Sequence, residues 1–78
     1  MPRRKVPRIR GPISNTVIGE RLTAARQETG LSQEKVGNAV GLSQQMIGRY
    51  ESGKAELKVQ MLQAICVVIR IAVSDLFK

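Results

Sequence analysis

The sequence has no histidine and no tryptophan, and Cys66 is the single cysteine among its 78 residues. A disulfide within the chain, a zinc site built from cysteine and histidine, and a histidine-based catalytic triad are therefore excluded. The longest nearly continuous apolar run covers residues 64–73, far fewer than the roughly 20 residues that a membrane span needs. The basic start leads into prolines and not into an apolar stretch, so we expect no secretory signal and a cytoplasmic location. We expect a binding protein without a cofactor or metal, and not an enzyme.

Acidic residues are scarce, because six Asp and Glu stand against thirteen Lys and Arg and give a net charge of +7. This balance makes an acidic polymer the first partner to consider, and nucleic acid leads among such polymers. Hydrophobic residues make up 42% of the chain, which is ordinary for a folded domain. The length allows a single small domain and excludes a multi-domain enzyme.

The positive charge is concentrated at the start of the chain, where residues 1–10 contain five basic residues and no acidic one. Prolines in the same segment disfavour a helix. We predict a basic, disordered N-terminal arm over residues 1–14, followed by a folded domain over residues 15–78. The arm would contact DNA phosphates or enter a minor groove; the alternative is a solvated tail that only aids solubility. The basic residues of the arm are Arg3, Arg4, Lys5, Arg8 and Arg10.

Apolar residues in the rest of the chain recur at intervals of three and four, which is the spacing of an α-helix. Ile18, Leu22 and Ala25 share one helix face, and Gly30 follows as the expected left-handed terminator. No strand-like alternation occurs before residue 64, so we predict a compact all-α fold with five helices. The expected helices cover residues 16–28, 33–40, 44–51, 58–69 and 74–78.

A tight turn joins the second and third expected helices, and a serine precedes each of them as a natural N-cap. Gly41 can adopt the positive φ that the turn requires, and Gly37 must be small because the two helices cross steeply. The apolar residues of the pair face the core, which leaves one face of the third helix in water. That face carries Gln44, Gln45 and Arg49. Glutamine can bond adenine and arginine can bond guanine in a bidentate way, although such residues can also be ordinary surface side chains.

Three short motifs surround this turn: Gly-Leu-Ser-Gln-Glu at 30–34, Gly-Leu-Ser-Gln-Gln at 41–45 and Tyr-Glu-Ser-Gly-Lys at 50–54. With them, residues 18–77 resemble the phage-repressor and Cro-type helix-turn-helix family of transcriptional regulators. The resemblance implies a lambda-repressor-like domain that binds double-stranded DNA in a sequence-specific way. It also implies a repressor that occupies its operator as a homodimer.

The resemblance implies roles for individual residues. Gln44, Gln45 and Arg49 would face bases in the major groove. Arg26 and Glu51 hold positions that can form an ion pair beneath the third helix, and the alternative is two unrelated surface charges. The residues that would contact the DNA backbone are Gln33, Ser43 and Lys54.

The sequence departs from the family pattern at a few positions. Gly37 stands where the family has alanine, and Gly48 lies inside the third helix, each at a cost of about 0.5 to 1 kcal/mol relative to alanine. Arg70 takes the place of the usual glycine at the end of the fourth helix. Ala72 takes the place of a capping serine, so the last helical turn is expected to be less well defined.

The fourth expected helix is apolar nearly all round, so it must be buried on more than one side, by the core alone or also by a second copy of the protein. One stripe of this helix and the residues that follow it form a candidate dimer surface. The alternative is that these residues only close the core. They are Ile71, Val73, Leu76 and Phe77.

Other functions remain open on the sequence. Three alternatives belong to the same biochemical class: an antitoxin that represses its own operon and binds a toxin protein, a restriction-modification controller, and a phage repressor domain cut from a longer chain. A protein-interaction adaptor would use the same fold, but the outer face of its third helix would be apolar. Non-specific binding of RNA or of a membrane surface through the arm alone would be abolished by deletion of residues 1–12.

Overall fold

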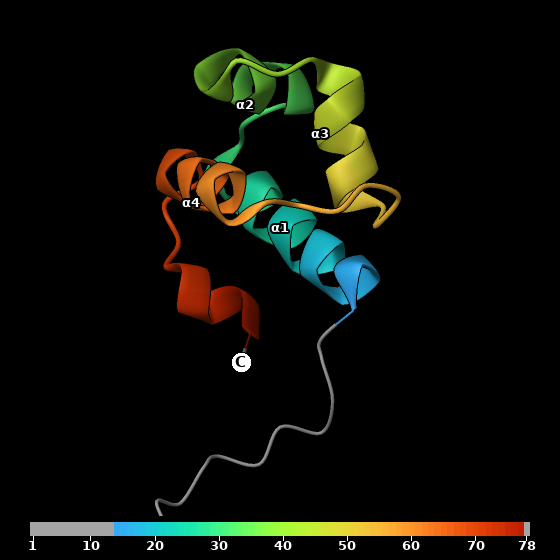
Figure 1. Cartoon of the computed structure of the whole chain (residues 1–78). Helices are drawn as coiled ribbons and strands as arrows, with labels where there is room; N and C mark the ends of the chain where they lie inside the picture. The colour runs from blue at the N-terminus through green and yellow to red at the C-terminus, as the bar shows by residue number, and fades with distance from the viewer. Residues whose placement is uncertain (1–13, 78) are drawn as a thin grey trace, which may run out of the picture.

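The computed structural model describes residues 14–77, and these form four α-helices and one short 3₁₀ helix (Figure 1). In chain order they are α1 (Asn15–Thr29), α2 (Gln33–Val40), α3 (Gln44–Glu51), α4 (Val59–Val68) and η1 (Val73–Phe77). The predicted all-α fold is confirmed, and each boundary lies within one residue of its expected position. The fifth helix differs in type, because it is the tighter 3₁₀ form.

Serine side chains begin the first three helices. The hydroxyl oxygens of Ser14, Ser32 and Ser43 each accept a hydrogen bond from the backbone N–H three residues further along, at 3.0 to 3.2 Å. Gly30 and Gly41 end α1 and α2 with φ of 75° and 78°, a region of backbone space that side chains disfavour. The helix boundaries are therefore set by local chemistry that is visible in the sequence.

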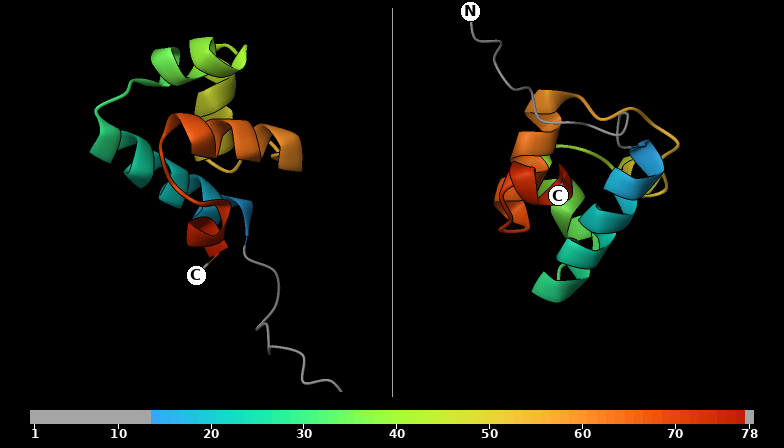
Figure 2. Two further views of the ribbon diagram at one scale, coloured as in Figure 1. Left: turned by 90° about the vertical axis from the view of Figure 1, so that its left-hand side faces the viewer. Right: turned by 90° about the horizontal axis from the view of Figure 1, so that it is seen from below.

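The core lies where the five helices meet. Each helix contributes at least one side chain that is at most 4% exposed: Leu22, Val36, Ile47, Ile65 and Leu76. The views in Figure 2 place α1 and α4 in the middle of the domain, with α2 and α3 at one end and η1 at the other. The α2 and α3 pair is thus held at one end, where the other described helices leave its outer side uncovered.

Helix α4 is buried along one stripe. Leu62, Ile65 and Cys66 lie in the core, whereas Val59 and Val67 are 66% and 77% exposed. No other described element covers the outer side of α4, so the single chain does not bury that side; its burial by a second copy of the protein stays a prediction. Hydropathy and length together rule out a membrane-crossing helix within residues 14–77.

Cys66 lies in the core and is 2% exposed. Burial, together with the nearby carboxylate of Asp75, raises the pKa of the Cys66 thiol. The thiol therefore remains protonated and unreactive at neutral pH. This agrees with the interpretation of Cys66 as a small buried hydrophobic residue.

The end of α4 contains a strained residue. Arg70 has a φ of 61°, and it is the one non-glycine residue in the described part of the chain with a positive φ. Its left-handed conformation lets the N–H of Ile71 donate to the carbonyl oxygen of Cys66 at 3.0 Å. Glycine is the usual residue in this position because a side chain there costs about 1 kcal/mol.

Replacing Arg70 with glycine is expected to raise the free energy of unfolding by about 0.5 to 1 kcal/mol, because relief of the strain outweighs the added freedom of the unfolded chain. Urea denaturation measures the change. Gly30→Ala is the matched control of opposite sign, since its φ is 75° and no atom within 4 Å would obstruct a Cβ. A loss of stability in Arg70→Gly would contradict the strain argument.

Two contacts hold η1 in place. The N–H of Ala72 donates to Oδ2 of Asp75 at 3.3 Å, which is the acidic half of a capping box and partly replaces the missing serine. Nη1 of Arg21 on α1 donates to the carbonyl oxygen of Leu76 at 2.6 Å. The last turn is therefore well defined in the structure, contrary to the expectation from the sequence.

Candidate nucleic-acid interface

The outer face of α3 carries three exposed polar side chains. Gln44 and Gln45 lie in the first turn of the helix, and Arg49 follows one turn after Gln45. Ile47, on the inner side, is 2% exposed and anchors the helix in the core. No other described segment covers the outer side of α3 in Figure 1. The three predicted base-reading residues therefore share one uncovered surface.

The backbone of the turn between α2 and α3 passes very close to α2 at Gly37. The N–H of Leu42 donates to the carbonyl oxygen of Gly37 at 2.8 Å. A Cβ on Gly37 would lie 2.5 Å from the carbonyl oxygen of Leu42, closer than real Cβ atoms approach. The predicted need for a small residue is confirmed, and it explains why glycine replaces the alanine of the family pattern.

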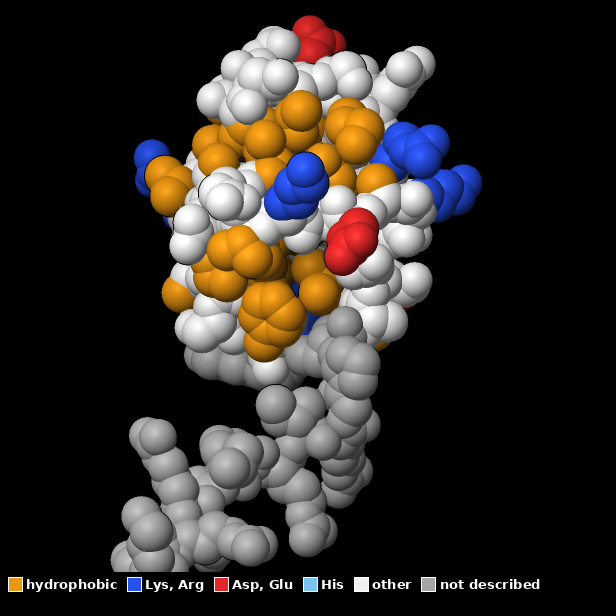
Figure 3. Space-filling model, viewed as in Figure 1, with side chains coloured by type: hydrophobic (Ala, Val, Ile, Leu, Met, Phe, Trp, Pro, Cys, Tyr) orange, Lys and Arg blue, Asp and Glu red, His pale blue; other side chains and the backbone are white. Residues whose placement is uncertain are grey.

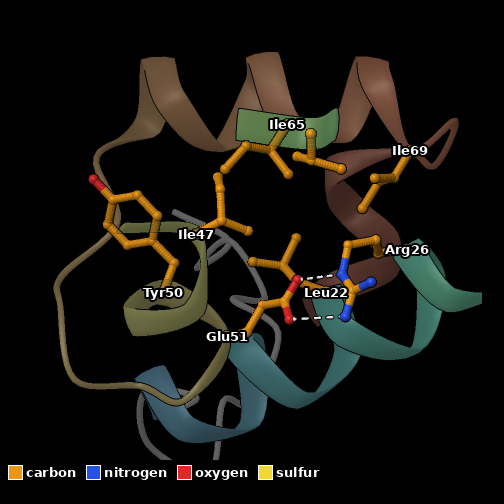
Figure 4. A pocket seen from close by; sticks show the side chains of 8 residues that line it. Leu22, Arg26, Ile47, Tyr50, Glu51, Ile65 and Ile69 are labelled. Carbon is orange, nitrogen blue, oxygen red and sulfur yellow. Dashed lines mark hydrogen bonds and ion pairs between the residues drawn. The ribbon is translucent and has the colours of Figure 1, made fainter. Parts of the chain in front are cut away.

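Arg26 on α1 and Glu51 at the end of α3 form the predicted ion pair (Figure 4). Nε of Arg26 lies 2.7 Å from Oε2 of Glu51, and Nη2 lies 3.2 Å from Oε1. The two side chains are only 13% and 8% exposed, so the pair is largely buried. The same guanidinium donates through Nη1 to the carbonyl oxygen of Leu31 at 2.9 Å. Arg26 thus joins α1, the loop before α2 and the end of α3.

Gln33, the first residue of α2, also reaches Glu51. Its Nε2 donates to Oε1 of Glu51 at 3.0 Å in a partly buried hydrogen bond. The side chain also lies beside α3 at Gly48, where an added Cβ would be 3.6 Å from Nε2 of Gln33, an ordinary contact. The sequence indicated a phosphate contact for Gln33 and missed this internal bond.

Gly19 sets how closely α1 approaches α3, and the sequence analysis missed it. A Cβ on Gly19 would overlap the carbonyl oxygen of Glu51 and lie 2.6 Å from that of Tyr50. Gly53, with a φ of 77°, meets α1 in a similar way at Thr16. Helix α1 therefore packs directly on the backbone at the end of α3. The presence of Gly19 inside a predicted helix could have indicated this close contact, since glycine is otherwise unfavourable in a helix.

The other predicted DNA-contacting residues lie around the same face. Lys54 is exposed just after α3, and its N–H donates to the carbonyl oxygen of Arg49 at 2.9 Å. Ser43 is exposed, and its hydroxyl caps α3. Figure 3 shows basic side chains projecting on the side of the domain where α3 lies. The basic residues of the arm, from Arg3 to Arg10, lie outside the described residues.

The candidate dimer residues divide between core and surface. Leu76 is 1% exposed and closes the core, so it is not part of any surface. Ile71 and Val73 are half-buried and pack against the core, and Phe77 is 45% exposed. Figure 3 shows apolar side chains gathered over η1. Of the four, Phe77 presents most of its surface to solvent.

A small cavity lies in the core between α1, α2, α3 and α4. The cavity in Figure 4 has a volume of about 10 Å³ and is bordered by the Arg26 and Glu51 pair and by apolar core residues. Such a space holds at most one water molecule. The exposed outer face of α3, with its three polar side chains, is the candidate functional site.

The arrangement of two short helices around a glycine turn, with a polar outer face on the second, matches the Helix-turn-helix family model over residues 22–76. The chain belongs to the helix-turn-helix family. An HTH-type transcriptional regulator of Sinorhizobium medicae is 34% identical over 61 residues, which cover 78% of this chain and 44% of the relative. The chain thus spans less than half the length of that relative.

Two solved structures are similar to this domain in sequence and fold. The restriction-modification controller protein C.AhdI from Aeromonas hydrophila is 27% identical, with a TM-score of 0.76 over 81% of this chain and 96% of the controller. The P22 c2 repressor protein, solved in complex with a synthetic operator, is 27% identical, with a TM-score of 0.70 over 76% of this chain and 89% of the repressor. These similarities confirm the predicted lambda-repressor-like fold.

Proposed function

We propose that this helix-turn-helix chain is a transcriptional regulator that binds double-stranded DNA in a sequence-specific way and represses by occupying an operator. The observation that carries the proposal is the uncovered outer face of α3, where Gln44, Gln45 and Arg49 are exposed together. A helix of this size fits the major groove, where amide and guanidinium groups can bond adenine and guanine edges. The similar P22 c2 repressor protein was solved in complex with a synthetic operator, which supports the same use of this fold.

Contacts to the DNA backbone complete the proposal. Lys54 supplies a flexible positive charge beside α3, and Ser43 lies at the N-terminal end of that helix, where the backbone favours anions. The basic arm adds phosphate contacts that increase affinity for any sequence. Described residues 14–77 carry seven basic and six acidic residues, so most of the excess positive charge comes from the arm.

Replacing Gln44 or Arg49 with alanine is expected to weaken binding to the preferred duplex by about 1 to 3 kcal/mol and to relax the preference at one or two base pairs. Selection from random duplexes identifies that duplex, and fluorescence anisotropy at fixed salt measures the affinities. Gln63→Ala is the matched control, because Gln63 is exposed on α4 and away from α3. Equal losses on the preferred and on random duplexes would contradict base reading.

We also propose that the chain binds DNA as a homodimer. One short helix reads few base pairs, and a second copy one helical turn away, about 34 Å, doubles the site. The exposed ring of Phe77, with the half-buried Ile71 and Val73, gives an apolar surface for the second copy.

Phe77→Ser is expected to weaken the dimer about tenfold, since loss of an interface aromatic typically costs more than 1 kcal/mol. Sedimentation equilibrium over a range of concentrations measures the dissociation constant. Ala24→Ser, on the exposed side of α1, should leave it unchanged. A monomeric wild-type protein, or a Phe77→Ser variant that dimerises equally well, would contradict this surface.

A restriction-modification controller is a second candidate, and it is favoured by the similarity to C.AhdI over 96% of that protein. Such a controller would read DNA through the same residues of α3. An adaptor function is disfavoured, because the outer face of α3 is polar and not apolar. No described feature supports a toxin as partner.

A further inference from the structure

Gln33 joins the far ends of α2 and α3. The two helices have eight residues each, so each is about 12 Å long, and they meet at the turn around Gly41. Figure 1 shows them crossing steeply. The 3.0 Å hydrogen bond from Gln33 to Glu51 links the first residue of α2 to the last residue of α3. The angle between the helices is therefore fixed at the turn and also at the two helix ends that lie farthest from the turn.

The acceptor of this bond is itself held in place. Both carboxylate oxygens of Glu51 accept hydrogen bonds from Arg26, at 2.7 and 3.2 Å. A carboxylate at the C-terminal end of a helix is disfavoured by the helix dipole, so Glu51 depends on these donors. Gln33 thus binds an anchor that is fixed to α1, and α2 cannot tilt away from α3 without breaking the bond.

Gly48 provides the space that Gln33 occupies. An added Cβ at position 48 would lie 3.6, 3.7 and 3.9 Å from the amide nitrogen, oxygen and carbon of Gln33. The carboxamide therefore lies against the backbone of α3 as well as donating to its last residue. A bulky side chain at position 48 would compete for this position.

We propose that Gln33 is a positioning residue that sets the angle between α2 and α3, and thereby the place of Arg49 relative to the DNA backbone; this rests on the proposed function. A rotation of about 5° moves the far end of a 12 Å helix by about 1 Å. Arg49 lies near that far end, whereas Gln44 lies next to the turn. Bonds to base edges tolerate only a few tenths of an ångström, so Arg49 is the reading residue that such a rotation displaces.

The test compares wild type with Gln33→Met, which keeps the length of the side chain and removes its donor. Affinities are measured for the duplex recovered by selection and for random duplexes, at a temperature where both proteins are folded. We expect a loss of about fivefold on the selected duplex, corresponding to one hydrogen bond, and less than about twofold on random duplexes. The base preference should weaken at the positions that Arg49→Ala also affects. The double variant, Gln33→Met with Arg49→Ala, should lose less binding free energy on the selected duplex than the two single variants lose together.

Several outcomes would overturn the proposal. Equal losses on both kinds of duplex would assign Gln33 to a direct phosphate contact, and an unchanged preference would show that the angle does not depend on it. Gln27→Met, the same change at an exposed glutamine of α1, should have no effect in any of these assays. A wild-type protein that prefers no duplex would contradict the proposed function itself, which separates that failure from failure of the role of Gln33.

Discussion

Replacing Arg26 with methionine is expected to lower the free energy of unfolding by about 3 kcal/mol, because the change leaves the buried carboxylate of Glu51 without its charged partner. Methionine keeps most of the side-chain volume. The decrease in the free energy of unfolding therefore comes mainly from the missing charge and hydrogen bonds, and less from a cavity. The guanidinium also holds the carbonyl oxygen of Leu31, which adds to the effect. Urea denaturation followed by circular dichroism measures the change.

Two further variants test this reasoning. Arg49→Met is the same change at an exposed arginine and should shift stability by less than about 0.5 kcal/mol. A double variant, Arg26→Met with Glu51→Met, removes both charges and should recover much of the loss, since an apolar pair of similar volume can replace a buried ion pair. Equal stabilities of Arg26→Met and Arg49→Met would contradict the importance of the pair.

The second large effect is expected for Gly19→Ala, which should lower the free energy of unfolding by about 2 kcal/mol. The new Cβ would overlap the backbone carbonyl of Glu51, and backbone atoms cannot move aside as a flexible side chain can. Helix α3 would have to shift away from α1. This cost outweighs the gain of about 1 kcal/mol that alanine brings to a helix.

Gly48→Ala is the matched control with the opposite sign. It is the same substitution inside a helix, but its Cβ would make only ordinary contacts, at 3.6 Å or more, with the side chain of Gln33. We expect it to raise the free energy of unfolding by about 0.5 to 1 kcal/mol. A stabilising effect of Gly19→Ala, measured by the same denaturation, would show that α1 and α3 are less tightly packed than the structure indicates.

The helices could be predicted because their signals are local. The serine caps, the glycine terminators and the apolar spacing all act within a few residues, and they place each boundary within one residue. The Arg26 and Glu51 pair was predicted from the resemblance, because the two residues occupy positions that can form an ion pair in that family. The base-reading roles of Gln44, Gln45 and Arg49 stay predictions. The exposure of these side chains on α3 is compatible with them.

Other features depend on how the helices cross, and no local pattern encodes that. The bond from Arg21 to the carbonyl oxygen of Leu76 spans 55 residues, and the bond from Gln33 to Glu51 spans 18. The need for glycine at position 19 becomes clear only from the packing of α3 against α1. Leu76 could equally have faced solvent or the core, because the sequence around η1 is too short to define a face.

Because the inner residues of α3 anchor the domain while its outer residues touch little of it, the outer positions are open to change. A library randomised at positions 44, 45 and 49 should consist mostly of folded proteins, each with its own preferred base pairs. The same separation would let new specificities evolve in this chain without loss of the scaffold.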